Sequence, residues 1–145
     1  MSGTTGAAGT RGGAGGAWTG PEARPRAVVI EDDDGVAALW TDVLEADGYA
    51  VLRRDSGLGL AGVLRAWRPD VVLLDLGLPY RSGAAVLADL KADPQTAPIP
   101  VVVVSGTAEA LSPARAAQAA AVLAKPVGPQ RLCAVVATAV RAGAV

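Results

Sequence analysis

The sequence predicts an α/β protein built on a doubly wound, five-stranded parallel sheet. Two observations predict this fold class: short, mostly β-branched apolar runs alternate with amphipathic helical stretches, and polar residues follow directly after the runs. Strands joined through helices run parallel with right-handed crossovers, so that helices cover both faces of the sheet. In this architecture ligands bind beyond the carboxyl ends of the strands. The polar residues after each run are therefore the candidate site.

The first half of the chain predicts two strands and two helices. The first apolar run, 27–30, stops at an acidic cluster, as a buried parallel strand does. A helical stripe spaced i, i+3, i+4, i+7, i+8 begins at Val36, and its helix is expected to end near Gly48. A second strand and a second helix are expected over 49–53 and 60–67.

The second half continues the alternation. The run 71–74 is the third buried strand and ends at Asp75. Ser82 is a suitable N-cap for the helix that follows. The fourth strand, 101–104, ends at Ser105, and an Ala-rich stretch separates it from a short fifth strand near 121–124. An apolar stripe over 132–140 predicts the last helix.

Residues 1–24 are expected to form a flexible Gly/Ala-rich tail, and 25–145 a single folded domain. The tail consists mainly of Gly, Ala, Thr and Ser, with one isolated Trp18. Such a segment buries too little apolar surface to offset the entropy lost on ordering.

The composition excludes several functional classes. The formal charge of −1 and the absence of a basic cluster predict no nucleic-acid partner and no attraction to an anionic membrane. The chain contains no His, which removes His-dependent triads and most zinc enzymes and leaves hard, oxygen-ligated cations. Its single Cys133 fits a reducing compartment. With no membrane-spanning run or secretion signal, the expected location is cytoplasmic.

Charged and hydroxyl residues stand at four strand ends. Glu31 and Asp32 follow the first strand, Asp75 the third, Ser105 the fourth and Lys125 the fifth. Two carboxylates about 4 Å apart repel by about 4 kcal/mol at an effective dielectric near 20, so such a cluster favours a bound cation. Mg²⁺ suits carboxylate oxygens, and a shielded carboxylate can attack phosphorus as a covalent nucleophile.

Structural roles compete with these functional ones. Asp33 or Asp34 is expected to be simply the N-cap of the next helix. Ser105 could also be a helix cap, and Lys125 a solvated charge. Trp40 and Trp67, on apolar helix faces, are expected in or near the core, and Cys133 is expected to act as a small hydrophobic residue.

Four segments resemble those of bacterial two-component response regulator receiver domains. They are 28–33, 71–79, 102–106 and 124–126. The resemblance covers about residues 26–142. It implies a stand-alone, chemotaxis-receiver-like domain with the flavodoxin-like receiver fold and strand order 2-1-3-4-5.

The resemblance also implies a role for each strand-end residue. Asp75 would be the phosphoacceptor. Ser105 and Lys125 would contact phosphoryl oxygens, and the Lys125–Pro126 peptide bond is expected to be cis. The Mg²⁺ ligands would be Glu31, Asp32, Asp75 and the Gly77 backbone carbonyl.

Two departures affect the expected switch. The family usually carries an aromatic residue or His three positions before the lysine, coupled to the hydroxyl at Ser105, and here that position is Val122. The stretch from Ser105 to Lys125 is also shorter than usual, and Pro113 interrupts the expected helix there. These features put the usual route of signal propagation in doubt, while the phosphorylation chemistry stays intact.

The expected partners follow from the resemblance. The phosphodonor would be a sensor histidine kinase, a phosphotransfer protein or a small molecule. The domain would catalyse only its own phosphorylation and dephosphorylation, and a homodimer is compatible with the family. Because the chain ends just beyond the last helical stripe, output is expected through contact with a downstream protein.

Two alternatives stay open. Val122 and the shortened helix region favour a degenerate receiver that binds proteins without being phosphorylated. A small phosphatase or hydrolase on the same architecture is disfavoured, because Gly77 stands where an acid/base Asp is needed and there is no cap insertion.

Overall fold

The computed structural model describes residues 24–106 and 111–144 and confirms the predicted architecture. Five parallel strands form one sheet in the order β2-β1-β3-β4-β5. Trp18 and nearly all of the predicted tail lie outside the described residues. The elements are β1 (Arg26–Ile30), α2 (Asp34–Ala46), β2 (Ala50–Arg54), α3 (Leu60–Trp67), β3 (Val71–Asp75), α4 (Gly83–Ala92), β4 (Val101–Ser105), α5 (Pro113–Ala116), β5 (Ala121–Ala124) and α6 (Pro129–Gly143).

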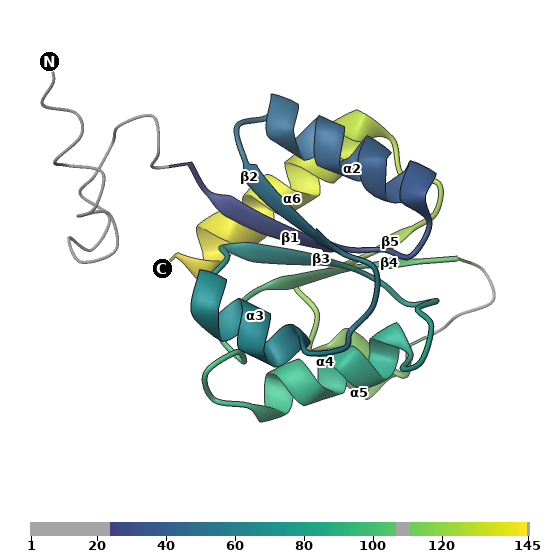
Figure 1. The fold of residues 1–145 in the computed structure, drawn as a ribbon, viewed down its shortest axis with the longest axis vertical. Coiled ribbons are helices and arrows are strands. Elements are labelled where there is room, and N and C mark those ends of the chain that lie inside the picture. Colours follow the sequence, from purple (N-terminus) through teal and green to yellow (C-terminus); the bar gives the residue numbers. More distant parts are fainter. Residues whose placement is uncertain (1–23, 107–110, 145) are drawn as a thin grey trace, which may run out of the picture.

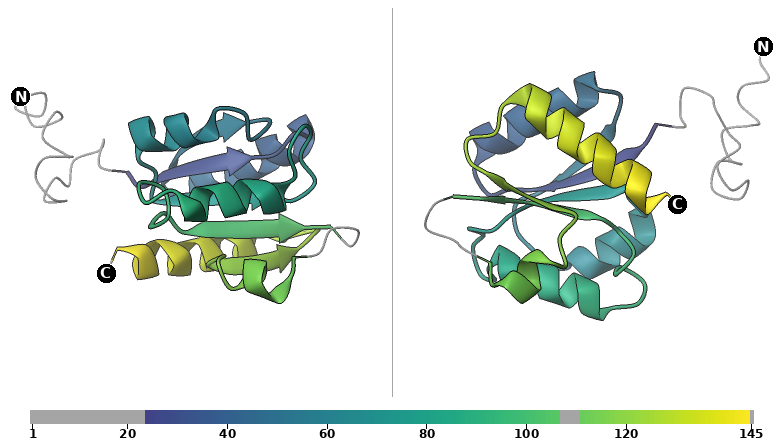
Figure 2. Two further views of the ribbon diagram at one scale, coloured as in Figure 1. Left: turned by 90° about the horizontal axis from the view of Figure 1, so that it is seen from below. Right: turned by 180° about the vertical axis from the view of Figure 1, so that it is seen from behind.

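The sheet is sandwiched between two helical layers, α2 with α6 on one face and α3, α4 and α5 on the other (Figures 1 and 2). Successive strand residues point to opposite faces. Val29, Leu73 and Val104 therefore join the core under α2 and α6. Their neighbours in the strands pack under α3 and α4 instead. Coverage on both faces explains why the central strands are continuous apolar runs without polar alternation.

A specific hydrogen bond marks each end of helix α2. Asp33 is its N-cap and accepts a hydrogen bond of 2.9 Å from the Val36 N–H, which confirms the capping interpretation. The predicted second strand, 49–53, was one residue early, because β2 begins at Ala50. The Tyr49 N–H donates to the Leu44 carbonyl at 3.0 Å, so Tyr49 closes the helix instead of pairing in the sheet.

The helices on the opposite face also differ in detail from the prediction. Ser82 caps α4 as predicted, accepting a hydrogen bond of 3.2 Å from the Ala85 N–H. Pro113 does not interrupt a helix; it opens α5 directly after its N-cap, Ser112. This is a favourable place for proline, because the first turn of a helix needs no N–H from it. Helix α5 is only one turn long.

The two tryptophans of the described region lie as predicted. Trp40 of α2 is buried, with 3% of its surface exposed, and Trp67 at the end of α3 is partly buried. Cys133 of α6 is partly exposed. Across residues 24–106 and 111–144, no helix is both long enough and apolar enough to cross a bilayer.

Candidate functional site

The carboxyl ends of β1 and β3 place two acidic side chains next to each other. The strands pair in parallel with Ile30 opposite Leu74, so the residues that follow, Glu31 and Asp75, are neighbours. Both are buried, with 1% and 2% of their surface exposed. Buried carboxylates are costly unless a positive charge or hydrogen bonds compensate them. This edge of the sheet therefore requires a cation.

Asp32 completes a cluster of three carboxylates. One oxygen from each of Glu31, Asp32 and Asp75 lies within 4.8 Å of the others. No hydrogen bond from the described part of the chain reaches Asp75 Oδ1, although this atom is buried. Hard divalent cations such as Mg²⁺ take carboxylate oxygens and complete their shell with water. The oxygen-only donor set fits such a cation, and among the described residues the buried Oδ1 is compensated by an ion pair alone.

Lys125 reaches the two buried carboxylates from the end of β5. Its Nζ lies 2.8 Å from Asp75 Oδ1 as an ion pair and donates a hydrogen bond of 3.1 Å to Glu31 Oε1. The ammonium lies 5.7 Å from the centre of the Trp40 ring, within the range of a cation–π contact. The peptide bond to Pro126 is cis. Lys125 is thus a paired group rather than a solvated charge.

The pKa shifts in this cluster reflect burial and the pairing of Lys125 with two carboxylates. Burial raises the pKa of Glu31, and the hydrogen bonds from the Asp33 backbone and from Lys125 offset this only in part. Burial acts to lower the pKa of Lys125, but its contacts with Asp75 and Glu31 outweigh burial and raise it. Lys125 is therefore positively charged at neutral pH and is shared between two buried carboxylates.

The other predicted site residues lie at the same edge of the sheet or near it. Ser105 ends β4, and its Oγ donates a hydrogen bond of 2.8 Å to the carbonyl of the next residue. The Lys125 N–H donates to the Ser105 carbonyl at 2.9 Å, which joins the ends of β4 and β5. Gly77 is exposed in the loop after β3. Val122 lies on the edge strand β5 and is 45% exposed.

Arg53 is a site residue that the sequence pattern did not reveal. Its Nε and Nη2 donate hydrogen bonds of 3.2 and 2.8 Å to the Glu31 carbonyl oxygen. Its Nη1 forms an ion pair of 2.8 Å with Asp34 Oδ1. The available signal was a basic residue near the end of the second strand, beside an acidic cluster at the end of the first. That signal becomes specific only once β1 and β2 are known to pair, with Val29 opposite Arg53.

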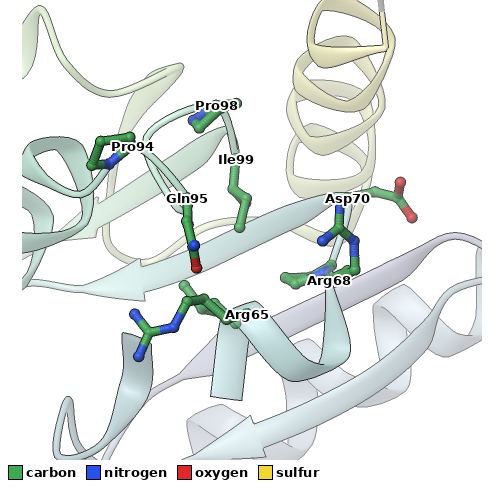
Figure 3. A pocket seen from close by; sticks show the side chains of 9 residues that line it. Arg65, Arg68, Asp70, Pro94, Gln95, Pro98 and Ile99 are labelled. Atoms are coloured by element: carbon green, nitrogen blue, oxygen red, sulfur yellow. The ribbon is translucent and has the colours of Figure 1, made fainter. Parts of the chain in front are cut away.

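A cavity of about 630 Å³ lies at the opposite edge of the sheet (Figure 3). Its walls come from the end of α3 and from the connection between α4 and β4, with Arg65 and Gln95 among the lining side chains. Arg65 is paired with Asp93 at 2.9 Å. The cavity is separate from the carboxylate cluster, because Asp70 in its wall precedes β3 whereas Asp75 ends that strand.

Sequence comparisons match most of the chain to known signalling proteins. The family model for the response regulator receiver domain matches residues 27–137. The polar-differentiation response regulator DivK of Brucella anthropi is 38% identical over 85 residues, which is 58% of this chain and 69% of that protein. The corresponding protein of Brucella ovis is 37% identical over 81 residues, or 56% and 66% of the two chains. The matches thus span about two thirds of these relatives.

Solved structures show the same fold. The CheY-like response regulator receiver domain from Methylobacillus flagellatus gives a TM-score of 0.73 at 26% identity, covering 80% of this chain and 98% of that one. A response regulator receiver domain protein from Clostridium thermocellum gives 0.73 at 25% identity, covering 81% and 95%. These likenesses confirm the predicted flavodoxin-like topology.

Proposed function

Because this chain belongs to the response regulator receiver family, we propose that it is the phosphoacceptor of a two-component signalling system, with Asp75 as the accepting residue. One observation carries the proposal. Asp75 is buried at the end of β3, 2.8 Å from Lys125 and within a cluster of three carboxylates. A carboxylate in that setting has the ammonium of Lys125 beside it and two neighbouring carboxylates with which it could share a divalent cation.

The residues have complementary roles in this proposal. An oxygen of Asp75 forms a bond to the donor's phosphorus, while the bond from phosphorus to the donor's nitrogen or oxygen breaks and the donor keeps that electron pair. Lys125 supplies positive charge beside the attacking carboxylate, and Ser105 offers a hydroxyl at the next strand end. Mg²⁺, held by Glu31, Asp32, Asp75 and the Gly77 carbonyl, neutralises negative charge when bound.

The proposed partners follow from family membership. The phosphodonor is a sensor histidine kinase, a phosphotransfer protein or a small phosphodonor, and the output is contact with a downstream protein. Such a kinase partner and the single Cys133 support a cytoplasmic location. The protein is a signalling component that catalyses only its own phosphorylation and dephosphorylation.

Intact-mass spectrometry after incubation with acetyl phosphate and Mg²⁺ tests the proposal. We expect wild type to gain one phosphoryl group and Asp75→Asn to gain none, because the amide is not a nucleophile of comparable strength. Ser105→Ala should be labelled more slowly. If wild type stays unmodified at saturating donor, phosphorylation at Asp75 is the wrong reading.

Two observations favour a second candidate, a receiver that binds proteins without phosphorylation. Position 122 lacks the switch aromatic, and α5 has a single turn. Beryllofluoride, a phosphoryl mimic, separates the two candidates. Mg²⁺-dependent binding of beryllofluoride supports the phosphoacceptor, and its absence together with unlabelled wild type supports the binding module.

A further inference from the structure

Arg53 lies beside the acidic loop that supplies two of the three clustered carboxylates. In the strand order β2-β1-β3, the strand that carries Arg53 and the strand that ends at Asp75 flank β1 on opposite sides (Figure 1). Lys125 contacts the Glu31 side chain, whereas Arg53 contacts the Glu31 backbone. The loop is therefore flanked by two cations, and only Lys125 contacts the clustered carboxylates.

Three nitrogen donors of the rigid Arg53 guanidinium contact both ends of the segment 31–34. Nε and Nη2 share the Glu31 carbonyl, and Nη1 takes the Asp34 carboxylate. The Glu31 carbonyl belongs to the peptide unit that leads into Asp32, so holding this carbonyl restricts the orientation of that peptide. The planar fork of arginine suits such a multiple contact, and the point charge of lysine does not.

The Asp32 side chain depends on this backbone restraint. Asp32 is exposed, and no hydrogen bond or ion pair with another described residue holds its carboxylate. Glu31, in contrast, is held by Lys125 and by the Asp33 N–H at 3.2 Å. The direction of the Asp32 carboxylate is therefore set by the loop to which Arg53 is bonded.

We propose that Arg53 is a positioning residue that increases the divalent-cation affinity of the cluster by holding the backbone between Glu31 and Asp34. This inference rests on the proposed function, since it concerns the same metal site. Arg53 does not touch the three clustered carboxylates through its own contacts, which go to a carbonyl and to Asp34.

The direction in which Mg²⁺ affinity changes when Arg53 is replaced distinguishes a positioning role from a purely electrostatic one. A guanidinium near a cation site repels the incoming cation, so electrostatics alone predicts tighter Mg²⁺ binding when Arg53 is removed. Positioning predicts weaker binding, because a loosened loop must be ordered before its carboxylates can act as ligands. Arg53→Lys keeps the charge and loses the fork, so its effect isolates the positioning contribution.

Isothermal titration of the full chain with Mg²⁺ is the test, on wild type, Arg53→Ala, Arg53→Lys and the matched control Arg54→Lys. Arg54 is the adjacent residue on the same strand, but its side chain bonds the Leu58 carbonyl at 2.9 Å, outside the acidic loop. We expect Kd to rise roughly tenfold in both Arg53 variants, as when a partner behind a metal ligand is lost. Arg54→Lys should match wild type.

A second measurement of Mg²⁺ binding uses the thermal stability of the protein instead of the heat of titration. Mg²⁺ that binds only the folded state raises Tm by an amount that falls as Kd rises, so the increment should shrink in the Arg53 variants at a fixed Mg²⁺ concentration.

Three outcomes would overturn the inference while leaving the proposed function in place. They are tighter binding by Arg53→Ala, wild-type affinity in Arg53→Lys, or an equal loss in Arg54→Lys. If wild type itself binds no Mg²⁺, the metal part of the proposed function and this inference both fail. The titration of wild type alone shows that failure, whereas the three outcomes above appear only in the variants.

Discussion

Glu31 combines burial with a negative charge. It is 1% exposed and shares the ammonium of Lys125 with Asp75. Burial raises its pKa above the ordinary value of 4.5 despite the nearby Lys125. Well below pH 4.5 the carboxyl is protonated in both the folded and unfolded states, and its contribution to stability is fully present. That contribution is lost as pH rises through the folded-state pKa.

The substitution Glu31→Gln should therefore stabilise the protein at neutral pH without Mg²⁺. The neutral amide avoids the cost of ionising a buried carboxyl, and we expect Tm at pH 7 to rise by about 4 °C, which for a domain of this size corresponds to roughly 1 kcal/mol. The difference should vanish well below pH 4.5, where Glu31 of the wild type is also neutral. Thermal unfolding followed by circular dichroism across this pH range measures it.

A lower Tm for Glu31→Gln at pH 7 would show that pairing with Lys125 outweighs burial. Mg²⁺ provides a control for the functional interpretation. It should raise the Tm of wild type more than that of Glu31→Gln, since the variant lacks one proposed ligand.

Helix α4 meets the end of β3 through a glycine. Gly83 is buried, and its N–H donates to the Leu76 carbonyl at 2.8 Å. A Cβ at this position would overlap the Asp75 carbonyl and lie 2.5 Å from Leu76 Cα. The first turn of α4 thus packs directly on the backbone of Asp75, where only a residue without a side chain fits.

Gly83→Ala should destabilise the protein by about 1–3 kcal/mol, the usual cost of overpacking a well-packed site. Gly62→Ala is the matched control, because Gly62 lies inside α3 and its Cβ would meet nothing within 4 Å. There, alanine should add roughly 0.5–1 kcal/mol through helix propensity. Urea unfolding of both variants measures the difference, and similar effects at the two positions would contradict the close approach of α4 to β3.

The whole molecule is organised by one sheet with a core on each face. Among the described residues, those that form the two cores fall between 27 and 140. Residues 71–74 of β3 and 101–104 of β4 are fully covered, as expected for central strands between two helical layers.

Deletion of residues 1–23 should leave Tm within about a few degrees of wild type, because their Gly- and Ala-rich composition offers little apolar surface to bury. Thermal unfolding of both chains under the same conditions measures the change. A large drop would instead indicate that the tail contacts the domain. Replacing Trp18, the one aromatic residue of that segment, would then be the next comparison.

Local sequence patterns were sufficient for the five strands and for helices α2, α3, α4 and α6, whereas the one-turn helix α5 was not predicted within its Ala-rich stretch. Apolar runs and helical stripes depend on near neighbours in the chain, and so do the caps at Asp33 and Ser82. Boundaries were less certain where two local interactions compete, as at Tyr49, which joins a helix end instead of a strand. The prediction also failed at Pro113, because a proline indicates the interruption of a helix unless it is known to lie in the first turn.

By itself, the sequence determined that carboxylates follow the first and third strands, and the family resemblance predicted Asp75 as the phosphoacceptor. Only the tertiary structure decided which charges meet. Lys125 lies 94 residues from Glu31 and Arg53 lies 22 residues from it, yet both bind it. Distance along a chain becomes distance in space only through strand order and register, and these are set by packing across the whole sheet.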